Sequence, residues 1–277
     1  MSATAAAGPR DTSRPLPFPI AARGVFRLAL EGMVWSRRSL LMAILLGLPI
    51  AFALLYRGIL VAHLPAKITG FDLYAVIIAR YYVRNVLPLA ALFYATSLIA
   101  DEVEGRTLTY LLTRPLVRPA ILAGKFAAYL TTTLALTLPS VVVTFFLLVT
   151  ARGFEGIGAG VPELFRDMGV VALTLMAYGA LFTLLGVLLR RPVIPGLLFL
   201  FVWELIVKLP GYLPRFTLTA WLRSLLHHRP AEEGLVGLFQ EQILPAGEAL
   251  GILVGASAVF LALAFWIFAQ REYVLDQ

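Results

Sequence analysis

The segment Asp101–Lys125, DEVEGRTLTYLLTRPLVRPAILAGK, separates two long uncharged runs, Val86–Ala100 and Phe126–Thr150. The segment begins with three acids and a glycine: Asp101, Glu102, Glu104 and Gly105. A short apolar stripe and four cations lie in the rest of it; the cations are Arg106, Arg114, Arg118 and Lys125. A simple connector between two membrane helices needs far fewer residues. We therefore expect this segment to be contacted by something outside the membrane.

The composition around this segment is that of a membrane protein. Hydrophobic residues make up 60% of the 277 residues and charged residues 14%, whereas soluble domains have roughly 45–50% and about 25%. The apolar excess lies in runs long enough for membrane spans of about 20 residues. A β-barrel would instead alternate over segments of about 10 residues. The sequence thus predicts an all-α, polytopic membrane protein.

The apolar runs predict one transmembrane domain at 21–270, between a disordered cytoplasmic tail at 1–20 and a C-terminal tail at 271–277. Residues 21–38 have the pattern of a basic amphipathic helix, which we expect to lie in the headgroup plane; the alternative is an extension of the first span. Its apolar side would carry Phe26, Leu30, Met33 and Val34. Six spans are predicted, at about 39–56, 76–100, 126–150, 169–189, 192–209 and 246–269.

Charged residues mark the predicted connectors. We expect connecting segments at about 57–85 and 151–168, with Arg80 and Arg84 snorkelling to the outer interface, because an arginine at the bilayer centre is costly. Residues 210–245 form a longer segment. Within it, four residues give a short helical stripe: Trp221, Leu222, Leu225 and Leu226.

Basic residues next to the spans predict the topology. The pairs Arg37–Arg38 and Arg190–Arg191 adjoin span ends directly, where the positive-inside rule acts most strongly. With six spans, both termini then lie in the cytoplasm, and so does the 101–125 segment. The expected location is the plasma (inner) membrane.

The central segment has the signals of a helix, a short transverse helix and a second long helix. Gly105 suits the end of the first, Thr107 can cap the next, and Pro115 ends it, with Pro119 in the first turn of the last. The transverse helix would present one apolar stripe at i, i+3 and i+4, formed by Leu108, Leu111 and Leu112. Such a stripe can lie on the inner leaflet or in the groove of a partner.

These residues resemble a motif of a known family. The passages Ile99–Leu108, Leu111–Arg118 and Gly124-Lys125 are similar to the central motif of type-two (exporter-type) ABC transporter permeases, where an acidic passage after the second span leads to a GT, LL, P-x-R and GK pattern. The layout over residues 21–270 resembles that family as well. Arg106 is a departure, since many members have glycine directly before threonine.

The resemblance implies a membrane-spanning subunit whose 101–125 loop is a coupling helix. It would sit in a cleft of a separate cytoplasmic ATP-binding subunit, and two permease subunits, identical or homologous, would pair with two such ATPases. The chain itself would hold no cofactor, because ATP and magnesium belong to the partner. The implied coupling residues are Glu102, Glu104, Gly105, Arg106, Thr107, Leu108, Leu111, Leu112, Arg114, Pro115 and Arg118.

Other chemistry finds little support in the sequence. A phosphate-binding loop needs GxxxxGK[ST], but Gly124-Lys125 is followed by Phe126 and lacks the upstream glycine. The absence of cysteine excludes disulfides and thiolate sites. The only histidines are His63, His227 and His228, which do not have zinc-ligand spacing. We therefore expect neither an enzyme nor a metal protein.

Two features of the predicted spans each have two possible roles. Glu204 lies on a predicted span and could contact substrate, or it could pair with Lys208 four residues later. Gly251 and Gly255 form a GxxxG pair that permits close helix packing. It could act at a dimer seam, but we favour packing within the subunit.

Three other functions compete with the permease. An ion- or proton-coupled secondary transporter would need ionisable groups inside the membrane and usually an internal repeat, and mid-span charges are few here. A membrane anchor or assembly factor would bind an ATPase without moving a substrate. An intramembrane enzyme is disfavoured by the lack of a nucleophile, base and metal set.

Overall fold

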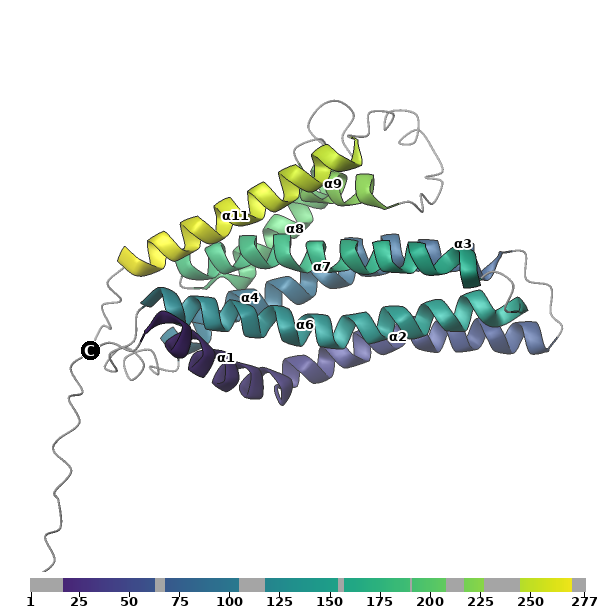
Figure 1. Ribbon diagram of the computed structural model, residues 1–277, viewed down its shortest axis with the longest axis horizontal. Helices are drawn as coiled ribbons and strands as arrows, with labels where there is room; N and C mark the ends of the chain where they lie inside the picture. Colours follow the sequence, from purple (N-terminus) through teal and green to yellow (C-terminus); the bar gives the residue numbers. More distant parts are fainter. Residues whose placement is uncertain are drawn as a thin grey trace, which may run out of the picture.

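The computed structural model describes residues 17–62, 68–104, 118–153, 157–189, 191–207, 217–226 and 245–270, and these form helices without any strand. The all-α prediction is confirmed for this part of the chain. Figure 1 shows the long helices lying side by side in one elongated bundle. The helices are α1 (Phe18–Val34), α2 (Arg37–Val61), α3 (Gly70–Val76), the π-helical η1 (Ile77–Val86), α4 (Leu87–Glu104), α6 (Arg118–Val149), the 3-10 turn η2 (Thr150–Arg152), α7 (Ile157–Leu188), α8 (Val193–Val207), α9 (Leu218–Leu225) and α11 (Ala246–Gln270).

Five stretches in the described residues are long and apolar enough to cross a membrane: Arg37–Val61, Gly70–Leu98, Pro119–Val149, Gly160–Leu188 and Ala246–Gln270. The predicted span at 192–209 coincides with α8, which has 15 described residues, fewer than the roughly 20 that a crossing needs. Residues from 208 to 216 lie outside the described ranges. A sixth span is therefore not confirmed.

Two predicted connectors are largely helical. The second span starts at Gly70, where the Thr69 hydroxyl accepts a hydrogen bond from the amide of Asp72 and caps α3, and the helix continues through η1 and α4. Residues 157–168, predicted as a loop, form the beginning of α7. Their charges indicated a loop, but a charged residue such as Asp167 can be buried between helices, and here it is.

The helical stripe predicted near Trp221 is confirmed as α9, Leu218–Leu225. Thr217 caps this helix by accepting a hydrogen bond from the amide of Ala220. The hydroxyl groups of Tyr178 on α7 and Thr219 on α9 lie 3.0 Å apart and are hydrogen-bonded. The short helix is thus joined to the bundle, and Figure 1 shows it beside the start of α11.

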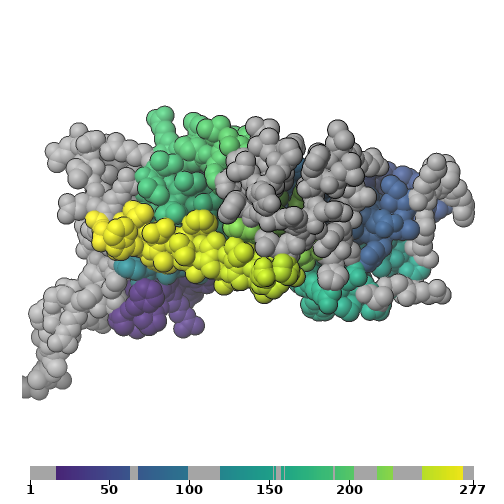
Figure 2. All heavy atoms as spheres, turned by 90° about the horizontal axis from the view of Figure 1, so that it is seen from above, coloured from purple at the N-terminus to yellow at the C-terminus, as the bar shows by residue number. Residues whose placement is uncertain are grey.

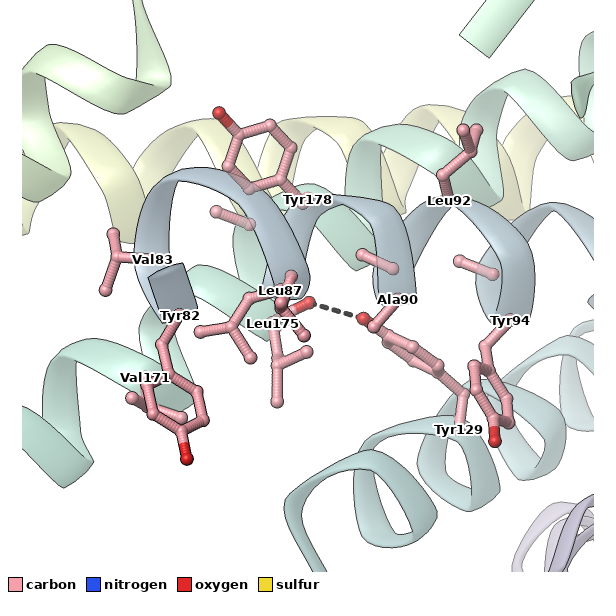
Figure 3. Close-up of a cluster of buried hydrophobic side chains, with 14 of the residues drawn as sticks. Tyr82, Val83, Leu87, Ala90, Leu92, Tyr94, Tyr129, Val171, Leu175 and Tyr178 are labelled. Atoms are coloured by element: carbon pink, nitrogen blue, oxygen red, sulfur yellow. Dashed lines mark hydrogen bonds between the residues drawn. The ribbon is translucent and has the colours of Figure 1, made fainter. Parts of the chain in front are cut away.

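Tyr129 of α6 joins α6 to α7 in the core of the bundle. Its hydroxyl donates a hydrogen bond of 2.8 Å to the carbonyl of Leu175, as Figure 3 shows. One turn further along α7, a Cβ added to Gly179 would stand 2.3 Å from Cε1 of the Tyr129 ring. Only glycine at position 179 leaves room for this fully buried ring.

In the part of the chain that the structure describes, the GxxxG pair of α11 does not pack against another helix, although we favoured packing within the subunit. Among the described residues, no atom lies within 4 Å of a Cβ added at Gly251 or Gly255. Leu250 and Val254 on the same helix are also exposed. Figure 2 shows α11 lying along the outside of the bundle. The pair faces outward because α11 meets its neighbours through another side, which carries Leu253 and Ser257.

Candidate functional site

The structure describes the two helices that flank the central loop. Glu102 and Glu104 lie in the last turn of α4, and Arg118 is the first described residue of α6, which places Pro119 in its first turn as predicted. The remaining coupling residues lie outside the described ranges, so the transverse helix stays a prediction: Gly105, Arg106, Thr107, Leu108, Leu111, Leu112, Arg114 and Pro115. Glu204 is on α8, and its role in a substrate pathway also stays a prediction.

Lys125 connects these two flanking helices. Its ammonium group on α6 donates a hydrogen bond to the backbone carbonyl of Leu98 on α4, and the side chain is only 7% exposed. Lysine is almost never this buried unless its charge is compensated. The bond therefore holds together the base of the loop, close to the point where both helices leave the bundle.

The electrostatics of this contact are favourable. The C-terminal end of a helix carries a partial negative charge, and Leu98 lies in the C-terminal half of α4. The last turns of this helix also include the acidic positions 101, 102 and 104. The buried ammonium group from α6 thus binds a carbonyl in the C-terminal half of α4, and this bond stabilises the pairing of the two helices.

Sequence reasoning did not single out Lys125, because the residue was counted with the loop cations. The signal that could have found it is its position, directly before the uncharged run that begins at Phe126. A lysine there can either extend into the headgroups or turn back into the bundle. Only the packing of α4 against α6 decides for the second.

Gly124, the neighbour of Lys125, allows α1 to approach α6 closely. A Cβ added at Gly124 would stand 2.5 Å from the carbonyl oxygen of Ala22 and 3.0 Å from the amide nitrogen of Phe26. Ala21 and Val25 of α1 are buried in this contact region. Figure 1 shows α1 beside the first part of α6.

This contact corrects the predicted apolar face of α1. Ala21 and Val25 are its most buried residues. Of the residues that we placed on the apolar side, Phe26, Leu30 and Met33 are partly buried and Val34 is half exposed. We interpreted this pattern as a face toward lipid, but Val25 lies against Gly124 of α6. The helix exists, and its predicted position in the headgroup plane is not confirmed.

The start of α2 is attached to the same end of the bundle. Its cap residue Ser36 accepts a hydrogen bond from the amide of Ser39, and the Ser39 hydroxyl lies 2.7 Å from the Tyr94 hydroxyl of α4. Both Ser39 and Tyr94 are buried. Four helices, α1, α2, α4 and α6, are thus joined around the base of the loop.

We expect Gly124→Ala to lower the free energy of unfolding by about 1–3 kcal/mol, the usual cost of overpacking, because the added methyl group meets backbone atoms of α1 that cannot rotate away. Thermal unfolding in detergent measures the effect. Gly24→Ala on α1 is the matched control, since nothing in the described residues lies within 4 Å of its Cβ. Equal stability of the two variants would show that α1 does not rest on Gly124.

Comparison with known families bears on the bundle from the second half of α2 onward. The family described as "ABC-2 family transporter protein" matches residues 53–273, which is most of the chain. The chain belongs to the ABC-2 transporter family. No curated protein matches it.

This ABC-2 chain is therefore a multi-pass membrane protein and the membrane subunit of an ABC transporter, as the resemblance implied. The matched range includes both helices that flank the central loop and the Lys125–Leu98 contact. It begins inside α2, so α1 lies outside the match. The Gly124 contact hence joins a helix outside the match to the centre of the matched range.

Proposed function

We propose that this ABC-2 chain forms the translocation pathway of an exporter and is driven by a separate cytoplasmic ATP-binding subunit through the 101–118 segment. Two copies, or one copy and a homologous permease, would complete the membrane part. Both termini would lie in the cytoplasm. ATP and magnesium would be bound by the partner, and this chain would carry out no catalysis.

The Lys125–Leu98 contact is the observation that carries this proposal beyond family membership. A loop can transmit a push to the membrane helices only if its two ends move together with those helices. The buried ammonium joins α4 and α6 at the base of the loop, and Gly124 joins α6 to α1. Movement of the loop would thus reach three helices at once.

The charge pattern of the segment supports a protein partner. Acids at 102 and 104 are followed by arginines at 106, 114 and 118, so the segment offers charges of both signs to an opposing surface. Complementary charges of this kind set partner choice and register more than raw affinity. The family match does not favour the rival ion- or proton-coupled secondary transporter.

We expect the charge swap Glu104→Arg with Arg114→Glu to abolish co-purification of an ATP-binding protein in mild detergent, when the chain is expressed with its neighbouring gene products. The swap preserves net charge and reverses local complementarity, and like charges brought together at an interface cost several kcal/mol. The amount of ATP-binding protein retained per mole of permease is the measurement.

The matched control is Arg23→Glu with Glu31→Arg, the same exchange on exposed positions of α1. It should retain the partner at the wild-type level. Retention of the partner by both swapped chains would count against the loop as the docking segment. Failure of any ATP-binding protein to co-purify with the wild-type chain would bring the secondary transporter forward.

A further inference from the structure

The backbone of α2 is interrupted inside its membrane-spanning part. Pro49 has no amide hydrogen, so the carbonyl of Leu45, four residues earlier, loses its normal helix donor. The hydroxyl of Tyr81 on η1 donates a hydrogen bond of 2.5 Å to this carbonyl. A side chain from a neighbouring helix thus replaces the missing backbone donor, as membrane helices with proline require.

A second helix is interrupted at the same level. Pro139 lies inside α6, and the next residue, Ser140, donates a hydrogen bond of 2.6 Å to the carbonyl of Leu46 on α2. Because the single hydroxyl proton of Ser140 is used there, Tyr82 is the donor in the 2.7 Å bond between its hydroxyl and that of Ser140. The chain of bonds runs from η1 through α6 to α2.

The third helix at this level has a wider turn. Over the ten residues of η1 the second span is π-helical, and Tyr81 and Tyr82 both lie in it. The side-chain amide of Asn85 donates to the carbonyl of Arg80, five residues earlier. Helices bend at proline and at π-helical turns rather than in regular stretches, and π-helical turns often lie at functional sites.

We propose that Tyr81, Tyr82 and Ser140 form a hinge layer, at which α4 and the loop-side halves of α2 and α6 change direction relative to α3 and the far halves of α2 and α6. Three interruptions of regular helix coincide here, and hydroxyl groups hold the backbone carbonyls of α2. A hydroxyl can rotate and keep its bond over a range of angles, so the layer can bend without leaving those carbonyls unsatisfied in lipid. Its use in transport rests on the proposed function.

The absence of cysteine in the chain allows spin labels to be placed at will. A loop-side pair at Ala127 and Trp266 and a far-side pair at Phe146 and Leu250 join exposed positions of α6 and α11. Residue 127 is about 20 Å along the helix from Ser140 at 1.5 Å per residue. A bend of about 20° at the layer would move it by about 7 Å. Pulsed electron–electron double resonance on the full-length chain in lipid nanodiscs measures both distances.

Ser140→Ala removes the donor to α2 and the acceptor for Tyr82. We expect the loop-side distance distribution to broaden or shift by up to about 7 Å, while the far-side distribution stays the same. Pro139→Ala restores a backbone amide hydrogen to α6, and we expect it to narrow the loop-side distribution. A hinge thus predicts broadening in one variant and narrowing in the other. If the two residues only contributed to packing, both substitutions would broaden the distribution.

Ser257→Ala on α11 is the matched control, because Ser257 is equally buried but its hydroxyl bonds to Leu253 of its own helix. It should leave both distributions unchanged. Equal responses of the loop-side and far-side pairs to Ser140→Ala, or no effect of Pro139→Ala, would overturn the hinge. Should Ser140→Ala fail to fold, Tyr81→Phe at a partly exposed position removes only the bond to Leu45. It must then broaden the loop-side distribution, and an unchanged one overturns the proposal.

This test is independent of the coupling proposal, since it uses the chain alone without any ATPase. Failure of any ATP-binding protein to co-purify with the wild-type chain would count against the proposed function and leave the hinge intact. Unchanged distances in the hinge variants would remove the hinge and leave the docking segment intact.

Discussion

Gly179→Ala is expected to lower the free energy of unfolding by about 2 kcal/mol, within the range for overpacked cores. The new methyl group would stand 2.3 Å from Cε1 and 2.7 Å from the hydroxyl oxygen of Tyr129. The ring is fully buried and its hydroxyl is bonded to Leu175, so it cannot rotate aside without losing that bond. Thermal or denaturant unfolding in detergent measures the effect.

Gly251→Ala is the matched control for this prediction. It makes the same chemical change in another membrane helix, at a position with open space in the described residues. Its effect should stay within about 0.5 kcal/mol, as for most surface substitutions. Adding Tyr129→Leu to Gly179→Ala should recover part of the loss, because contacting residues are not additive. Equal stability of the two alanine variants would contradict the packing described here.

Lys125→Met is expected to weaken the base of the loop. Methionine keeps much of the apolar stem but cannot donate to the carbonyl of Leu98. Loss of a hydrogen bond from a charged group costs about 1.5–3 kcal/mol, and α4 and α6 would no longer be held together at the base of the loop. We expect reduced thermal stability together with reduced retention of the ATP-binding partner.

Lys125→Glu should be more severe, because it places a buried carboxylate against a backbone carbonyl and leaves an uncompensated charge, at a cost of about 3–5 kcal/mol. Arg27→Met on the exposed face of α1 is the control for removal of a cation. It should alter neither stability nor partner retention. Lys125→Met behaving like Arg27→Met in both measurements would show that the buried contact does not support the loop.

Much of the fold could be predicted from the sequence. Apolar runs of membrane-crossing length predicted the helical membrane protein, Pro119 predicted the first turn of α6, and the spacing around Trp221 predicted α9. These signals are local: a long apolar run must satisfy its own backbone groups in lipid, and it does so as a helix. Charged residues misled the analysis at 157–168, because a charge marks solvent only when no neighbouring helix covers it.

For the candidate site, too, local signals in the sequence predicted one part and missed another. The order of acids, glycine, leucines and arginines between 101 and 118 suggested a coupling segment from sequence alone, and this role remains a prediction for the whole segment. The role of Lys125 was missed, and the packing within the subunit that we favoured for the GxxxG pair is not found among the described residues. The environments of Lys125 and of the GxxxG pair both depend on which helix lies opposite a given face, and the sequence does not show this.

The sequence by itself determined that this chain is a helical membrane protein, because the length and polarity of each segment act within that segment; the ABC-2 family followed from the motif resemblance and the family match. The tertiary structure alone decided that Lys125 turns inward, that Gly124 and Gly179 are close contacts while Gly251 is open, and that Tyr81 and Ser140 meet the carbonyls beside Pro49. The physical reason is that helix formation depends on hydrogen bonds between near neighbours in the chain. Burial and contact depend on residues that are distant in the chain and are brought together only when the helices pack.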